Sequence, residues 1–133
     1  MPFVVDASVA LSWCFEDETT PTGERALTLL TTEPALVPPL WWWEVTNVLV
    51  VAERRDRITE AQAARFLDVL QDLPIRVDDG ALPPGRWLDL ARAHKLTTYD
   101  ASYLELAERT GSRLATTDTA LVEAARRAGV ALV

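Results

Sequence analysis

The stretch FVVDASVALSWCF, residues 3–15, consists of a short apolar run, an aspartate and a segment with helical spacing. The apolar run is typical of a buried strand, and Asp6 is a favoured residue for starting the helix that we expect over 7–15. The same order of strand and helix recurs along the chain. Short apolar strands that alternate with helices predict an α/β domain whose mainly parallel sheet is covered on both faces.

The other elements are expected from apolar runs, caps and turn residues. Strands are expected at 35–37, 75–77, 113–115 and 130–133, and helices at 24–32, 40–55, 59–72, 84–95, 100–110 and 118–128. Thr59 and Gln62 form a capping-box sequence, and Gly111 and Gly129 are expected to end the last two helices. A chain of 133 residues suits one core, so we interpret residues 1–133 as a single domain.

The composition excludes several classes of protein. Hydrophobic residues make up 49% of the chain and charged residues 25%, as in a globular protein. Cys14 is the only cysteine, which excludes an internal disulfide and a zinc site built on several thiolates. The N-terminal segment lacks the basic start of a signal peptide, and no apolar run approaches the roughly 18 residues of a membrane span. We therefore expect a cytoplasmic protein that does not enter a membrane.

The charge balance is acidic, with 13 Lys and Arg against 20 Asp and Glu and a net charge of −7. Proteins that bind nucleic acid usually have a basic face, so this balance argues against such a partner. The argument weakens if several acids share one site for divalent cations, because a cation-loaded acidic pocket presents positive charge to phosphate. The best candidates for steering RNA are arginines near helix ends: Arg54, Arg55, Arg57, Arg126 and Arg127.

Glu44 lies inside LWWWEVTNVLVV, residues 40–51, one of the most apolar segments of the chain. The segment is too long for a strand and predicts a helix, and a helix that is apolar nearly all round is buried. A buried carboxylate without a partner is strongly unfavourable, and no basic residue lies within a turn of Glu44. We therefore expect Glu44 either to face a cation or to open into a cleft.

Three aspartates stand where strands end or helices begin. Asp6 and Asp118 each follow a predicted strand, and Asp100 opens a predicted helix. Helix capping explains each aspartate alone, at about 1 kcal/mol, but it cannot explain Glu44. Parallel strands end at the same edge of a sheet, so Asp6 and Asp118 are expected there together. One pocket that binds a hard divalent cation explains all four carboxylates.

Four blocks of the sequence, taken together, resemble the motifs of PIN-domain ribonucleases, in particular the VapC-type toxins of type II toxin–antitoxin systems. These blocks are VVDASVALSWCFEDE, VPPLWWWEVTNVL, LTTYDASYLELAERTG and LATTDTALVEAARRAGV. The resemblance covers about residues 3–133 and implies a PIN-like three-layer α/β/α fold with a short, mainly parallel central sheet. It implies that the catalytic, metal-binding residues are Asp6, Glu44, Asp100 and Asp118, with Ser8, Asn47 and Thr116 as supporting polar residues.

The resemblance also implies an activity and its partners. It implies an endoribonuclease that depends on Mg²⁺, or alternatively Mn²⁺, with an RNA substrate, a VapB-type antitoxin and a homodimeric assembly. The metal would activate a water molecule, and the proton could pass either to a carboxylate or to hydroxide on the metal. Some relatives carry a further acid after the last aspartate. Glu123 is the nearest acid here and is left out of the metal-binding set, so the number of metals stays open, as does the identity of the RNA.

Two other functions compete with this interpretation. One is a PIN-like module that binds RNA or a protein partner without cutting, but such a module does not need all four acids. The other is a phosphatase with an aspartyl nucleophile. Such phosphatases commonly have a second acid two residues after the nucleophile, and Ser8 occupies that position here.

Three consecutive tryptophans precede Glu44. Successive helical residues are about 100° apart, so Trp41, Trp42 and Trp43 spread over roughly 200° of the helix surface. If Glu44 faces a pocket, at least one tryptophan is expected to point outward. Such a residue would suit a homodimer or antitoxin contact, unless the helix at 59–72 covers all three.

Overall fold

Four parallel strands form the only sheet in the computed structural model, which describes all residues from 1 to 133. They are β1 (Phe3–Val5), β2 (Ala35–Val37), β3 (Ile75–Val77) and β4 (Arg113–Ala115), in the order β3-β2-β1-β4. β1 lies between β2 and β4, and all three of its residues are fully buried. The predicted parallel sheet is confirmed.

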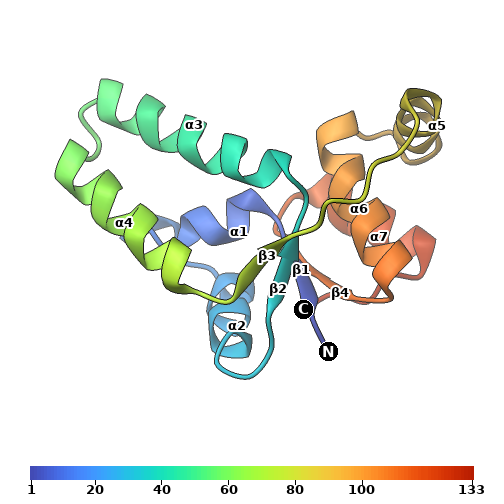
Figure 1. The fold of residues 1–133 in the computed structure, drawn as a ribbon, viewed down its shortest axis with the longest axis horizontal. Helices are drawn as coiled ribbons and strands as arrows, with labels where there is room; N and C mark the ends of the chain where they lie inside the picture. The colour runs from blue at the N-terminus through green and yellow to red at the C-terminus, as the bar shows by residue number, and fades with distance from the viewer.

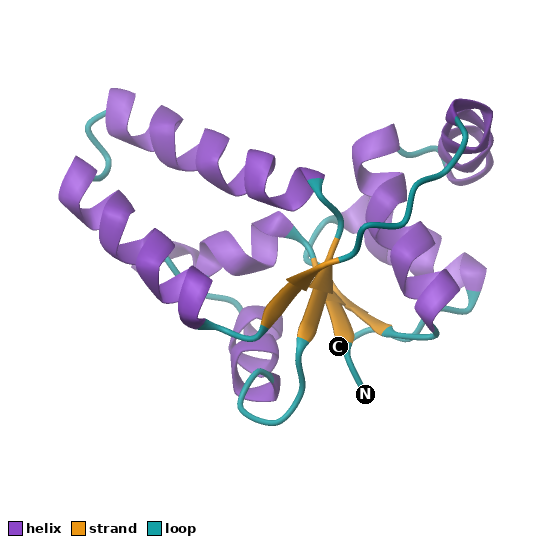
Figure 2. Cartoon of the chain, in the orientation of Figure 1, coloured by secondary structure: helices purple, strands orange, loops and turns teal.

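Helices cover both faces of this sheet. Figure 1 shows α1 (Ala7–Ser12), α2 (Pro21–Leu29), α3 (Leu40–Arg54) and α4 (Glu60–Asp72) on one side. On the other side lie α5 (Pro84–His94), α6 (Thr98–Thr110) and α7 (Thr119–Ala128). Figure 2 shows the strands as the middle layer between these two groups of helices. The three-layer α/β/α arrangement expected from the family resemblance is therefore confirmed.

Several helix ends form for the reasons that the sequence indicated. The capping box of α4 is complete: Gln62 N–H donates to the Thr59 hydroxyl, and Thr59 N–H donates to the Gln62 side chain. Gly111 and Gly129 end α6 and α7 with φ values of 63° and 75°, a left-handed conformation that glycine adopts without strain. These caps set the C-terminal ends of α6, which precedes β4, and of α7, which follows it.

Other boundaries differ from the predictions. The helix predicted at 24–32 begins earlier, at Pro21, because the Thr20 hydroxyl caps it by accepting from Gly23 N–H. α6 begins at Thr98 because Thr97 is its cap, so Asp100 lies within the first turn and is not the capping residue. α1 ends at Ser12, before the end predicted at residue 15.

The last predicted strand, 130–133, is wrong as a strand. It is reduced to a single parallel bridge between Leu114 and Leu132 beside β4. Only two backbone hydrogen bonds join the segments: Leu114 N–H donates to Ala131 O, and Val133 N–H donates to Leu114 O. Both of these bonds involve Leu114, so the contact stays a bridge and does not extend into a ladder.

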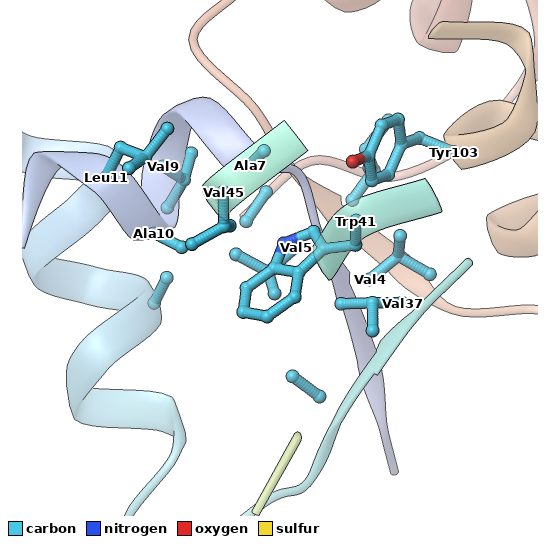
Figure 3. Packing of buried hydrophobic residues seen from close by; sticks show 14 of the residues in the cluster. Val4, Val5, Ala7, Val9, Ala10, Leu11, Val37, Trp41, Val45 and Tyr103 are labelled. Carbon is cyan, nitrogen blue, oxygen red and sulfur yellow. The ribbon is translucent and has the colours of Figure 1, made fainter. Parts of the chain in front are cut away.

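The core lies between the sheet and its helices. In Figure 3 the Trp41 ring packs among Val5, Val37 and Val45, close to the turn from β1 into α1. Trp41 is fully buried, although its indole N–H has no acceptor. None of the helices combines the length and apolar character required to span a bilayer.

The long apolar helix α3 is buried along one stripe only, contrary to the expectation of burial all round. Its buried residues follow helical spacing at Trp41, Val45, Leu49 and Ala52. Trp43 lies off this stripe and its surface is 80% exposed. The prediction that one tryptophan points outward is confirmed, and the alternative that α4 covers all three is wrong.

Candidate metal centre

Asp6 stands at the carboxyl end of β1 and is 5% exposed. Its Oδ1 accepts hydrogen bonds from Ser8 Oγ at 2.8 Å and from Val9 N–H at 2.9 Å, and its Oδ2 accepts one from Thr116 Oγ1. Burial raises the pKa of Asp6, and these three hydrogen bonds oppose the rise. Asp6 is thus both the cap of α1 and a buried carboxylate held by donors on α1 and on Thr116, the residue directly after β4.

Glu44 is half-buried on α3 and faces the same region. Its Oε1 accepts a hydrogen bond from the hydroxyl of Tyr103, on α6. Burial raises the pKa of Glu44, the Tyr103 hydrogen bond lowers it, and the nearby charges of Asp100 and Asp6 raise it further. The sequence predicts that Glu44 faces a cation or opens into a cleft. In the structure, Glu44 accepts a hydrogen bond from a hydroxyl group and lines an open hollow.

Asp100 and Asp118 complete the set of acids. Asp100 is half-buried in the first turn of α6, and its pKa is raised by burial and by the charge of Asp118. Asp118 is exposed beyond β4, where its Oδ1 caps α7 by accepting from Leu121 N–H at 2.9 Å. The hydroxyl of Thr116 accepts from Asp118 N–H at 3.1 Å.

The charges of these four acids act on one another. Asp100 interacts with each of the other three acids. The charge of Asp100 raises the pKa values of Asp6 and Glu44, and the charge of Asp118 raises the pKa of Asp100. None of the ion pairs in the protein involves any of the four acids. The fold therefore gathers four carboxylates without a basic side chain to neutralise them.

These carboxylates do not stand in a closed ligand cage. No three His, Cys, Asp or Glu side chains lie close enough together to enclose an ion. Asp6 accepts from hydroxyl and amide donors, Glu44 accepts from Tyr103, and Asp118 accepts from the backbone of its own helix. The donor set still fits a hard divalent cation, because it consists of uncompensated carboxylate oxygens.

The three supporting polar residues differ in their contacts. Ser8 and Thr116 both donate to Asp6, and the two hydroxyls of Ser8 and Thr117 lie 3.5 Å apart at the surface. Asn47 is exposed on α3, nearly one turn beyond Glu44, and lines the same hollow. Ser8 and Thr116 thus orient Asp6 directly, whereas Asn47 only lines the same hollow as Glu44.

A hollow of about 560 Å³ opens beside Glu44, with Trp43 and Asn47 among its lining residues. A larger hollow of about 610 Å³ shares Pro39, Leu40 and Tyr99 with it, but none of the four acids lines it. That larger hollow lies between α5, α6 and the loop after β3. We centre the site on the smaller hollow because Glu44, which interacts with the charges of Asp6 and Asp100, lines it, whereas none of the four acids lines the larger hollow.

Among the arginines proposed to steer RNA, Arg57 already has partners. It pairs with Asp17 at 2.7 Å and with Glu18 at 3.1 Å, and it stacks over the Phe15 ring at 4.0 Å. Arg57 therefore anchors the loop after α1 and is a poor candidate for phosphate contact.

Sequence reasoning missed Tyr103 as a member of the site. The available signal was its spacing: Tyr103 lies three residues after Asp100, so both occupy one face of the same helix. An apolar-looking aromatic position within a helix is normally assigned to the core. Tyr103 does lie in the core, but its hydroxyl reaches the acids.

The comparison with known proteins identifies the family. The PIN-domain family model matches residues 3–127. The chain belongs to the PIN-domain family. Ribonuclease VapC3 of Pyrobaculum aerophilum is 33% identical over 125 residues, which cover 92% of this chain and 94% of that protein. The VapC-type resemblance seen in the four sequence blocks is confirmed.

A solved structure supports the same fold. The crystal structure of PAE2754 from Pyrobaculum aerophilum superposes with a TM-score of 0.73 at 26% sequence identity. The match covers 93% of this chain and 84% of that one. The similarity therefore extends over nearly the whole PIN-domain chain and not only over the motif blocks.

Proposed function

We propose that this PIN-domain protein is a Mg²⁺-dependent endoribonuclease that acts as the toxin of a toxin–antitoxin pair. The observation that carries the proposal is the gathering of four uncompensated carboxylates at the carboxyl ends of β1 and β4. The name of the similar Ribonuclease VapC3 supports RNA cleavage and the toxin role.

Asp6, Glu44, Asp100 and Asp118 would hold the cation. When bound, a divalent cation polarises a phosphoryl oxygen and lowers the pKa of water, so that no protein nucleophile is required. The protein's own contribution is orientation. Ser8 and Thr116 fix Asp6, and Tyr103 fixes one oxygen of Glu44 and leaves Oε2 free. Asp118 is exposed and uses only Oδ1 to cap its helix, so its Oδ2 is available to a ligand or to water.

The same arrangement favours cleavage over simple binding. A module that only binds RNA gains nothing from burying Asp6 and placing Asp100 against Glu44, because both features weaken attraction to phosphate. Repulsion among these acids is relieved by a divalent cation, which turns an acidic cleft into one that accepts phosphate. The net charge of −7 is then compatible with an RNA substrate.

Association with an antitoxin and with a second copy of the chain belongs to the same proposal. Trp43 is 80% exposed and lines the hollow beside Glu44, so its indole is available to a protein partner. Exposed tryptophans next to a functional cleft are typical interface anchors. A partner that binds over Trp43 would also cover the hollow that Glu44 lines.

A nuclease assay tests this function. Purified protein incubated with total RNA should cut it in the presence of Mg²⁺ or Mn²⁺ and stop cutting when EDTA is added. Mapping of the new ends should reveal internal cuts. Asp6→Asn is the matched control, because it removes a charge with little change in volume and should abolish cleavage. Cleavage that persists in EDTA, or in the Asp6→Asn protein at the wild-type rate, contradicts the proposal.

A further inference from the structure

Tyr103 is a polar residue in an apolar place. It is 1% exposed on the inner face of α6 and lies with Trp41 and Val45 in the core. Figure 3 shows its ring among the core side chains, with the hydroxyl oxygen directed away from α6. A phenylalanine would fill the same space, so the hydroxyl is the part of this side chain that packing alone does not explain.

The hydroxyl is directed at Glu44. It donates a hydrogen bond to Glu44 Oε1, and it remains a donor because burial and the Glu44 carboxylate raise the pKa of Tyr103 far above its ordinary value. The hydroxyl therefore joins two helices that carry acids of the site, α6 with Asp100 and α3 with Glu44.

Glu44 needs such a restraint. The charges of Asp100 and Asp6 repel its carboxylate, and no cationic side chain pairs with it. The hollow beside it leaves room for a long, flexible side chain to swing outward. A donor rooted in the core opposes that movement.

We propose that Tyr103 is the positioning residue of the site, which holds Glu44 toward Asp6 and Asp100 and thereby sets the concentration of divalent cation at which the site fills. This inference rests on the proposed metal-dependent function. Side chains that orient metal-binding residues typically change metal affinity 10- to 100-fold when they are removed. Tyr103 acts through Glu44 and need not touch the substrate.

The direct test is a titration of the full chain with Mn²⁺. Electron paramagnetic resonance measures the concentration of free Mn²⁺ and so gives the binding affinity. Tyr103→Phe should weaken Mn²⁺ binding by about 10-fold or more. Thr110→Val is the matched control: Thr110 lies on the same helix, but its hydroxyl donates to Leu106 O and to none of the four acids, so its loss should leave Mn²⁺ affinity unchanged. At saturating Mn²⁺, the Tyr103→Phe protein should regain a maximal cleavage rate close to that of the wild type, since only filling of the site is impaired.

A double-mutant cycle shows whether the effect passes through Glu44. Glu44→Gln should weaken Mn²⁺ binding, and adding Tyr103→Phe to it should weaken binding little further. Additive losses would mean that Tyr103 acts elsewhere and would overturn the inference.

A spectroscopic test does not require the Tyr103→Phe protein to fold. The chain has two tyrosines, so Tyr99→Phe protein labelled with 3-fluorotyrosine reports on position 103 alone. Its fluorine resonance should shift during Mg²⁺ titration with the midpoint of metal binding. A resonance that stays fixed while Mg²⁺ binds overturns the inference.

The outcomes separate the two proposals. If the wild-type protein neither binds Mn²⁺ nor cuts RNA, the proposed function fails and this inference fails with it. If the wild-type protein does both, and Tyr103→Phe matches its Mn²⁺ affinity, the inference alone is wrong.

Discussion

The hydroxyl of Thr116 donates a hydrogen bond to Oδ2 of Asp6, although the two residues are 110 positions apart in the chain. The same hydroxyl accepts from the backbone N–H of Asp118. One side chain therefore connects two acids that follow neighbouring parallel strands. Their proximity is a consequence of the sheet order, which places β4 beside β1.

Thr116→Val should destabilise the metal-free protein. Valine keeps the shape of threonine but leaves the buried Asp6 carboxylate without one of its donors. Loss of a hydrogen bond to a buried polar group costs about 1–3 kcal/mol in the free energy of unfolding. Urea denaturation in EDTA measures this loss. Thr117→Val is the matched control, since Thr117 is exposed and its closest hydroxyl contact, Ser8, is 3.5 Å away. Equal stability of the two variants would contradict the role of Thr116.

Thermal stability without metal should rise as the pH falls from neutral toward mildly acidic values. Burial, together with repulsion among the acids, raises the pKa values of Asp6, Glu44 and Asp100 above their ordinary values of 3.8, 4.5 and 3.8. The folded state then binds protons more tightly than the unfolded state, so stability falls as the pH rises through these raised values. Melting curves in EDTA between neutral pH and about pH 4 test this.

Asp78 has the opposite effect on stability at low pH. Hydrogen bonding to Arg109 lowers the pKa of Asp78, so its contribution is lost only when the pH falls below the ordinary value of 3.8. Stability should therefore pass through a maximum. Mg²⁺ should raise the melting temperature more at neutral pH than near that maximum. A melting temperature that falls steadily from neutral pH downward would contradict the raised pKa values of Asp6, Glu44 and Asp100.

Trp41 and Trp43 should respond in opposite ways to replacement by alanine. Trp41 is fully buried, and its loss should cost about 3–5 kcal/mol of stability. Trp43 is 80% exposed, and its loss should change the free energy of unfolding by no more than about 0.5 kcal/mol. Urea denaturation measures both values.

Trp43→Ala should instead weaken association. Sedimentation velocity reports the oligomeric state, and titration with the cognate antitoxin reports that affinity. A Trp43→Ala protein with unchanged self-association and unchanged antitoxin binding would remove Trp43 from both interfaces.

Much of the fold follows from local sequence signals. The three-residue strands at 3–5, 35–37, 75–77 and 113–115 and the capping box of α4 are local features, and all are confirmed. The α2 boundary was misplaced because Thr20 and Pro21 were not recognised as a cap and first turn. The segment 130–133 has the composition of a strand, but only Leu132 pairs with β4, and pairing with a neighbouring strand is a tertiary relationship that no local pattern contains.

The site was less predictable than the fold. The acids stand out because Asp6 and Asp118 follow strands and Glu44 interrupts an apolar helix. That these carboxylates bind a metal stays a prediction. The role of Tyr103 depends on how α6 packs against α3, a tertiary relationship that spacing within one helix cannot supply. Likewise, the exposure of Trp43 follows from the rotation of α3, which is set by Trp41 and Val45 in the core.

The central claim is that Asp6, Glu44, Asp100 and Asp118 together hold a divalent cation. The most direct measurement is an anomalous difference map from crystals of the full chain grown with Mn²⁺. We expect a peak at the carboxyl ends of β1 and β4, with oxygens of these acids within bonding distance, and no such peak in Asp6→Asn crystals. A map without a peak at that position, although Mn²⁺ supports cleavage in solution, or a peak coordinated by other residues, would contradict the account.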